Sequence, residues 1–175
     1  MINEPLPTDM TRENTCCFTG HRKIPADREK EVVLALSRTV RILAVNGYRW
    51  FVCGGAIGFD TLAAEAVLKW REKAKIRLFL ALPCLDQTED WVKYPDFEEN
   101  IRRYRDIKAQ ADFVYYTGEL RTQTAMKTRN QYMVDVSSLC TAFYNGAPRS
   151  GSGQTYRMAQ KAGLEVYNLY DEIMR

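Results

Sequence analysis

Apolar runs of strand length alternate with segments of helical periodicity from residue 15 to the end of the chain. The strand-like runs cover residues 15–20, 48–55, 75–83, 112–118, 138–146 and 164–170. Between them, apolar side chains recur at helical spacing over residues 27–46, 59–73, 89–110, 123–136 and 153–162. Strands that alternate with helices in this way form βαβ units. The sequence therefore predicts a single α/β domain, with a mostly parallel sheet of about six strands and helices on both faces.

The length of 175 residues fits one domain. Residues 1–14 are predicted to be a loose N-terminal lead-in, and residues 15–175 to form the domain. The five cysteines are odd in number and lie in or beside apolar runs, as free thiols do in a reducing compartment. The opening residues lack the pattern of a signal peptide, and no apolar run is long enough to span a membrane. We therefore expect a cytoplasmic protein with no membrane partner.

The charge balance suits a small anionic ligand. The formal net charge is +3, and the dense basic patch of a non-specific nucleic-acid binder is missing, so a nucleic acid is not the expected partner. A single histidine argues against a His-based zinc site. We expect no metal site and no required cofactor. A homodimer is compatible with this fold, although no residue pattern argues for one.

Unusual loops follow four of the predicted strands. They are Thr19-Gly20-His21-Arg22, the stretch from Gly54 to Asp60, the stretch from Pro83 to Gln87, and the stretch from Gly146 to Thr155. In open parallel sheets, ligands bind outside the carboxyl ends of the strands, where the strand order reverses. Four such loops on one edge are harder to explain as unrelated turns than as one site.

The stretch "GGAIGFD" at residues 54–60 has two interpretations. Gly54, Gly55 and Gly58 allow either a simple tight turn or a close approach of the backbone to a phosphate at the start of the next helix. Asp60 either caps that helix or accepts hydrogen bonds from a ribose hydroxyl. The residues alone leave both pairs of alternatives open.

Two further loops contain ligand candidates. In "TGHR", Arg22 is a bidentate partner for phosphate or carboxylate, and we favour ligand contact over acid–base catalysis for His21. In "SGSGQT" at residues 150–155, Gly151, Gly153 and Thr155 form either a second anion cradle or a flexible surface loop. Arg129 and Asn130 lie in a helical segment whose periodicity favours a solvated face for both.

The ordered set "TGHR", "GGAIGFD" with Glu65 after it, "LPC…Q…W", "RNQYMVD" and "NG…SGSGQT" resembles the YpsA-like branch of the SLOG superfamily. That superfamily also includes the DNA-processing protein A (Smf) family and the LOG phosphoribohydrolases. The resemblance covers residues 15–170 and implies a Rossmann-like sheet of strand order 3-2-1-4-5-6 with a nucleotide-derived ligand at its carboxyl edge. It also moves Arg129 into the cleft.

Two departures from the family pattern bear on function. The second loop reads Gly153-Gln154-Thr155 where the branch usually has "GGT", and no carboxylate follows Thr155 where the phosphoribohydrolases place a catalytic glutamate. The leading hypothesis is therefore a sensor or regulatory module that binds ADP-ribose, NAD or a nucleoside monophosphate. One alternative is a phosphoribohydrolase-like hydrolase with His21, Asp60 or Glu65 as its catalytic residue. The other is single-stranded DNA binding of the DNA-processing protein A type.

Overall fold

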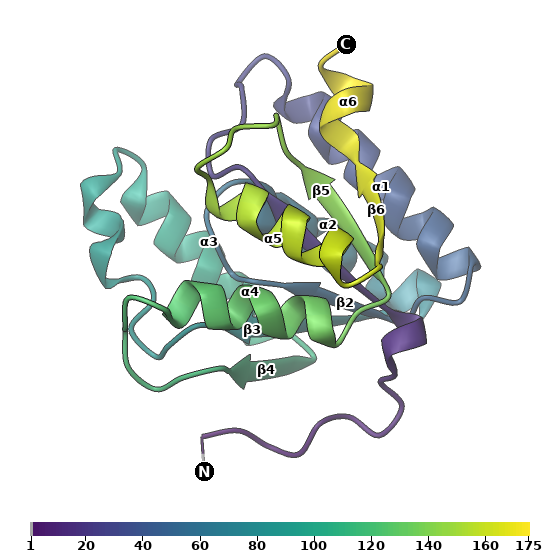
Figure 1. The fold of residues 1–175 in the computed structure, drawn as a ribbon, viewed down its shortest axis with the longest axis horizontal. Coiled ribbons are helices and arrows are strands. Elements are labelled where there is room, and N and C mark those ends of the chain that lie inside the picture. The colour runs from purple at the N-terminus through teal and green to yellow at the C-terminus, as the bar shows by residue number, and fades with distance from the viewer. Residues whose placement is uncertain (1) are drawn as a thin grey trace.

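A six-stranded, all-parallel sheet forms the centre of the computed structural model, which describes residues 2–175 (Figure 1). Its spatial order is β4-β3-β2-β1-β5-β6. The strands are β1 (Thr15–Gly20), β2 (Trp50–Cys53), β3 (Arg77–Leu82), β4 (Phe113–Tyr116), β5 (Leu139–Phe143) and β6 (Glu165–Asn168). All six lie within the predicted runs, so the predicted α/β fold class is confirmed.

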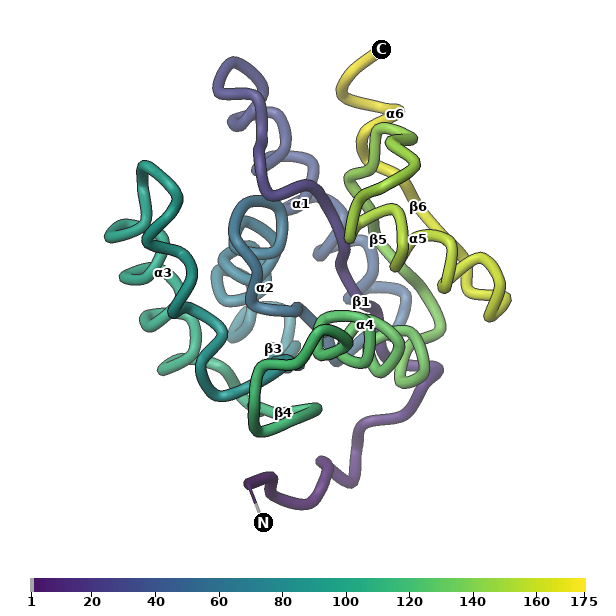
Figure 2. The backbone as a smooth tube through the Cα atoms, turned by 60° about the vertical axis from the view of Figure 1, so that its left-hand side comes forward, coloured from purple at the N-terminus to yellow at the C-terminus, as the bar shows by residue number. Residues whose placement is uncertain are grey.

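Helices cover both faces of this sheet. They are α1 (Glu29–Val45), α2 (Phe59–Ala74), α3 (Phe97–Gln110), α4 (Ala125–Asp135), α5 (Gly151–Lys161) and α6 (Leu169–Ile173), with short 3₁₀ helices η1 (Arg12–Asn14) and η2 (Glu89–Lys93). In Figure 1, α4 and α5 lie in front of the sheet, and they pack against each other. The opposite face carries α1, α2, α3 and α6, with α2 and α3 side by side (Figure 2).

Two hydrophobic clusters lie on the two faces of the sheet, because successive strand side chains point in opposite directions. Phe18, Phe51 and Leu80 belong to the cluster under α1, α2 and α3. Val52 and Phe79 belong to the smaller cluster under α4 and α5. Strands buried on both faces read as continuous apolar runs, which is why their positions could be predicted from the sequence.

The strand order implied by the family resemblance, 3-2-1-4-5-6, is wrong for this chain. Helices α1, α2 and α3 carry the chain outward from β1 through β2 and β3 to β4, always on the same face. Only then does α4 cross the opposite face and return the chain to β5, beside β1. With right-handed crossovers, a return in the other direction requires the other face. The order therefore reverses between β1 and β5.

Capping side chains shift two predicted helix boundaries. The helix predicted to begin at Gly153 begins at Gly151, because the Ser150 hydroxyl accepts a hydrogen bond from the Gly153 N–H and caps it. The last predicted strand ends at Asn168. There the Asn168 side chain accepts from the Tyr170 N–H, and α6 begins at Leu169.

The N-terminal segment passes beside the edge strand β4 (Figure 2). The Asn3 side-chain amide donates to the carbonyl of Tyr116 at 2.8 Å and accepts from its N–H at 2.7 Å. No helix among residues 2–175 has the length and apolar character needed to cross a bilayer.

Replacing Gly20 with alanine is expected to cost roughly 1–3 kcal/mol of stability. A Cβ at Gly20 would collide with the ring of Phe59, the first residue of α2, which stacks on Phe143 at 5.6 Å. Urea unfolding measures the loss, and Gly151→Ala is the control because a Cβ there meets no atom within 4 Å. Equal stability of the two variants would contradict close packing at the end of β1.

Candidate functional site

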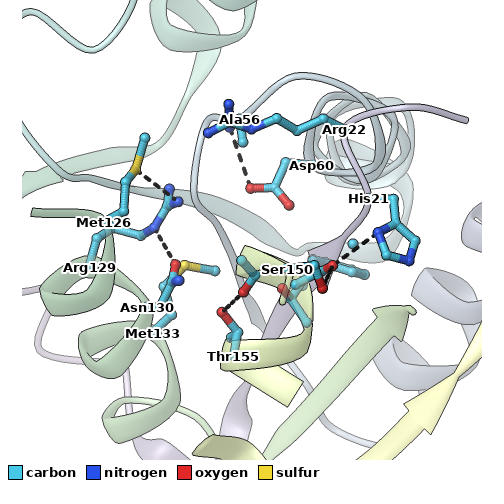
Figure 3. Close-up of a pocket in the computed structure, with 15 residues that line it drawn as sticks. His21, Arg22, Ala56, Asp60, Met126, Arg129, Asn130, Met133, Ser150 and Thr155 are labelled. Atoms are coloured by element: carbon cyan, nitrogen blue, oxygen red, sulfur yellow. Dashed lines mark hydrogen bonds between the residues drawn. The ribbon is translucent and has the colours of Figure 1, made fainter. Parts of the chain in front are cut away.

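A cavity of about 250 Å³ opens at the reversal point between β1 and β5 (Figure 3). The end of β1 and the loop after it, the loop before α2, one side of α4 and the start of α5 enclose it. Its lining residues are Phe18, Thr19, Gly20, His21, Arg22, Ala56, Asp60, Met126, Arg129, Asn130, Met133, Ser150, Gly151, Ser152 and Thr155.

Most of the residues proposed from the sequence meet in this cavity. Those that line it are Thr19, Gly20, His21, Arg22, Asp60, Arg129, Asn130, Gly151 and Thr155. Four proposed glycines lie behind the wall instead: Gly54, Gly55, Gly58 and Gly153. Their contribution is to the shape of the loops and not to the surface of the cavity.

The Asp60 carboxylate holds the first glycine loop. Its Oδ2 accepts hydrogen bonds from the N–H of Gly54 at 3.1 Å and of Ala56 at 3.4 Å. Asp60 is the second residue of α2, whose N-cap is Gly58, so it does not cap the helix. These two N–H groups of the first glycine loop therefore donate to an internal carboxylate and are not free to bind a phosphate.

The Asp60 side chain is buried, since the residue is only 6% exposed. Burial raises the pKa of its carboxyl group, and the nearby Arg129 guanidinium and the two N–H donors oppose that rise. The structure gives Oδ1 of Asp60 no donor among residues 2–175. This oxygen therefore remains available to accept a hydrogen bond from a ligand in the cavity.

Close backbone contacts explain the glycines of the first loop. Gly58 has a φ of +84°, and a Cβ there would collide with the backbone carbonyl of Arg22. A Cβ on Gly54 would collide with the Arg129 guanidinium. The loop before α2 is therefore pressed against the loop after β1, and the Phe59 N–H donates to the His21 carbonyl at 3.1 Å across this contact.

Arg129 is buried in the cavity wall, with 6% of its surface exposed. It donates to the carbonyl of Gly54 and, through Nε, to Oδ1 of Asn130 at 2.8 Å. Burial lowers the pKa of its guanidinium, and Asp60 opposes this. The solvated helix face suggested by the periodicity is wrong for Arg129 and Asn130, since both are buried.

Arg22 contributes a positive charge near the surface. Its side chain lines the cavity, is exposed, and donates to the Tyr94 hydroxyl at 2.8 Å. At the opposite wall, the first turn of α5 presents the N–H groups of Gly151 and Ser152, which have no acceptor within residues 2–175. Unpaired N–H groups at a helix N-terminus and a nearby guanidinium favour an anion in this space.

Glu65 lies away from this cavity. Its carboxylate accepts two hydrogen bonds from Arg103 of α3, at 2.8 and 2.7 Å, and it lines a separate groove between α2 and α3. The carboxylate group that the cavity does contain is that of Asp60.

Sequence reasoning missed several functional positions. The missed lining residues are Phe18, Ala56, Met126, Met133, Ser150 and Ser152. The position of Ser150 before a helical segment is a recognisable N-cap signal. Gln87, which is buried, also supports the site because its side-chain NH₂ donates to the carbonyls of Gly54 at 3.2 Å and Gly55 at 3.1 Å. Nothing in the sequence distinguishes Met126 or Met133 from ordinary core residues.

Replacing Asp60 with asparagine is expected to remove part of the pH dependence of stability. Folding raises the pKa of Asp60 above its ordinary 3.8, so the folded chain keeps this proton to a higher pH than the unfolded chain. The wild type should therefore lose stability relative to the variant as the pH rises above about 4. Urea midpoints between about pH 4 and pH 7 measure this, with the exposed Asp27→Asn as control. A difference that does not grow with pH would refute the expectation.

Comparison with known proteins places this site in a recognised fold. A UPF0398 protein of Bacillus cereus (strain B4264) is 27% identical over 140 residues, which cover 78% of this chain and 73% of the relative. Among solved structures, DNA processing protein A of Helicobacter pylori, for which a single-stranded DNA binding mode is described, matches with a TM-score of 0.63. It is 21% identical, and the match covers 96% of this chain and 75% of that one.

Two more structures share the fold at low identity. DNA processing protein A of Streptococcus pneumoniae matches with a TM-score of 0.62 and 22% identity. The match covers 90% of this chain and 50% of that one. The molybdenum cofactor carrier protein of Chlamydomonas reinhardtii has a TM-score of 0.53 and 17% identity, covering 89% of this chain and 75% of that one. These likenesses establish the fold alone.

The family model described as the YspA SLOG family matches residues 17–171, nearly the whole chain. The resemblance found in the sequence is thereby confirmed. The chain belongs to the YspA SLOG family.

Proposed function

We propose that this protein binds a nucleotide-derived ligand of the ADP-ribose, NAD or nucleoside monophosphate class in the cavity between β1 and β5. It does so in the cytoplasm, as a sensor or regulatory module, without a required cofactor. One observation carries the proposal: donors for an anion and an acceptor for hydroxyl groups line the same cavity. The donors are Arg22 and the first turn of α5, and the acceptor is Asp60.

The chemistry of the two walls assigns the parts of the ligand. A phosphate group binds at the N-terminus of α5, where the Gly151 and Ser152 N–H groups are unpaired and Arg22 is within the same cavity. The sugar lies toward Asp60, whose Oδ1 accepts from a ribose hydroxyl. Arg129 keeps Asp60 and the first loop in place and is a supporting group for this arrangement.

The size of the cavity favours the phosphorylated sugar as the part that is enclosed. Pockets for drug-sized ligands typically measure about 300–1,000 Å³. At about 250 Å³, this cavity holds a phosphate and a ribose, and it leaves a base or a second nucleotide in the open mouth.

A hydrolase of the phosphoribohydrolase type has less support. Tyr156, Arg157, Met158, Ala159 and Gln160 follow Thr155, so the carboxylate of that mechanism is missing from the start of α5. Glu65 is paired with Arg103 outside the cavity. Asp60 is the carboxylate left for such a role, and release of free base from a nucleoside monophosphate, lost in Asp60→Asn, would revive this alternative.

Single-stranded DNA is a second candidate ligand, because DNA processing protein A of Helicobacter pylori shares this fold and has a single-stranded DNA binding mode. That comparison does not support the expectation that a nucleic acid is an unlikely partner. Lys23 follows Arg22 along the chain, and Arg149 precedes Ser150. Both side chains are exposed, and they add positive charge beside the cavity. Affinity for an oligonucleotide that falls steeply with salt would favour this reading over a small ligand.

A thermal-shift screen with ADP-ribose, NAD, AMP and ribose 5-phosphate tests the proposal directly. A ligand at about a hundred times its dissociation constant adds roughly 2.7 kcal/mol of stability, which is readily measured. The absence of a shift with all four would refute the proposed ligand class.

Arg22→Ala is expected to weaken binding of the active compound by roughly 10- to 100-fold, because a hydrogen bond to a charged group contributes about 1.5–3 kcal/mol. Since Arg22 is exposed, the variant should keep its unfolding midpoint. Titration calorimetry measures the affinity. Lys23→Ala is the matched control, because Lys23 is also exposed and basic but does not line the cavity. Equal effects of the two variants would contradict a specific contact with Arg22.

A further inference from the structure

His21, the single histidine of the chain, has both ring nitrogens engaged by the loop and helix that follow β5. The backbone N–H of Asn145 donates to Nε2 at 3.0 Å, and Nδ1 lies 3.2 Å from the Ser152 hydroxyl. The ring is surrounded by Phe143, Tyr144 and Tyr170, with centroid distances of 6.4, 5.9 and 6.5 Å. Figure 3 shows the ring beside the start of α5.

These contacts determine where the imidazole proton lies. A backbone N–H can only donate, so Nε2 must present its lone pair to Asn145. A ring protonated on both nitrogens would direct an N–H at that N–H. With Nε2 accepting, the ring N–H lies on Nδ1 and donates to the Ser152 oxygen.

The direction of the next hydrogen bonds follows from this assignment. Because Ser152 Oγ accepts from His21, its own proton is free to donate, and it reaches Ser150 Oγ at 3.3 Å. Ser150 Oγ in turn donates to the Ala147 carbonyl, also at 3.3 Å. Both distances are long for O–H···O bonds, which normally measure about 2.5–3.0 Å. The Ser152 proton is thus weakly held and can turn toward an anion in the cavity.

We propose that His21 is a positioning residue, whose Nδ1–H fixes the Ser152 hydroxyl as a hydrogen-bond donor for the anion bound at the start of α5. A donor to the Ser152 oxygen also polarises its O–H and strengthens the bond that this hydroxyl donates. The proposal rests on the proposed function for the anion. It assigns His21 no acid–base role, because neither ring nitrogen has a lone pair facing the cavity.

The first test reads the proton position without any ligand. The imidazole nitrogens of ¹⁵N-histidine-labelled protein belong to one residue, since the chain has one histidine. We expect a protonated-type shift for Nδ1 and an unprotonated-type shift for Nε2 at neutral pH. The reverse tautomer, or a doubly protonated ring, would overturn the proposal.

The second test is a double-mutant cycle between His21 and Ser152 with AMP and ribose 5-phosphate as probes. Ser152→Ala and His21→Ala should each weaken binding about tenfold, the effect of one lost hydrogen bond to a charged group. His21→Ala should add nothing in the Ser152→Ala background, because His21 acts through that hydroxyl. His21→Asn, whose amide NH₂ can replace Nδ1–H, should restore most of the affinity.

The outcomes separate the two proposals. If the two losses are additive, or if His21→Asn binds as weakly as His21→Ala while all variants keep the wild-type unfolding midpoint, the positioning role is refuted. If none of ADP-ribose, NAD, AMP and ribose 5-phosphate binds the wild type, the proposed function fails, and the nitrogen shifts still decide whether Ser152 accepts a hydrogen bond from His21.

Discussion

The buried carboxylate of Asp60 is the interaction on which the site depends. It holds the backbone of the first glycine loop through Gly54 and Ala56, and the carbonyl of Gly54 in turn accepts from Arg129 of α4. Elements from both faces of the sheet thus meet at one loop, α2 from one face and α4 from the other. A charge in a place this enclosed persists only with hydrogen bonds and an opposite charge nearby, so the surrounding residues are constrained to supply them.

The fold was largely predictable because its signals are local. The inner strands β1, β2, β3 and β5 are buried and read as apolar runs, and the helices between the strands show an apolar stripe, so the fold class and the position of these strands followed from the sequence. The order of the strands depends instead on which face each crossover helix covers. The return of α4 across the sheet to β5 has no local signature, and the order borrowed from the family resemblance therefore failed.

The candidate site could be predicted by location more readily than by role. Loops after parallel strands meet at one edge, which brought His21, Asp60 and Gly151 into one cavity as expected. The roles depend on partners distant in sequence. Asp60 binds its own loop, the partner of Glu65 lies 38 residues away, and His21 contacts a serine 131 residues away. The helical or strand periodicity of a sequence does not predict side-chain pairings between such distant residues, because these contacts form only when the sheet is assembled.

The Asn3 side chain gives the outer edge of β4 a partner with the hydrogen-bonding groups of a peptide unit. The single side-chain amide of Asn3 hydrogen-bonds both the backbone N–H and the backbone C=O of Tyr116, as a neighbouring strand would. Edge strands with unpaired backbone groups invite other chains to add to the sheet. A recombinant form that lacks this asparagine, or in which a fused tag displaces it, therefore leaves the N–H and C=O of Tyr116 exposed at the edge of the sheet, where another chain can pair with them. The tendency of the purified protein to aggregate then depends on the N-terminal residues, which lie away from the cavity.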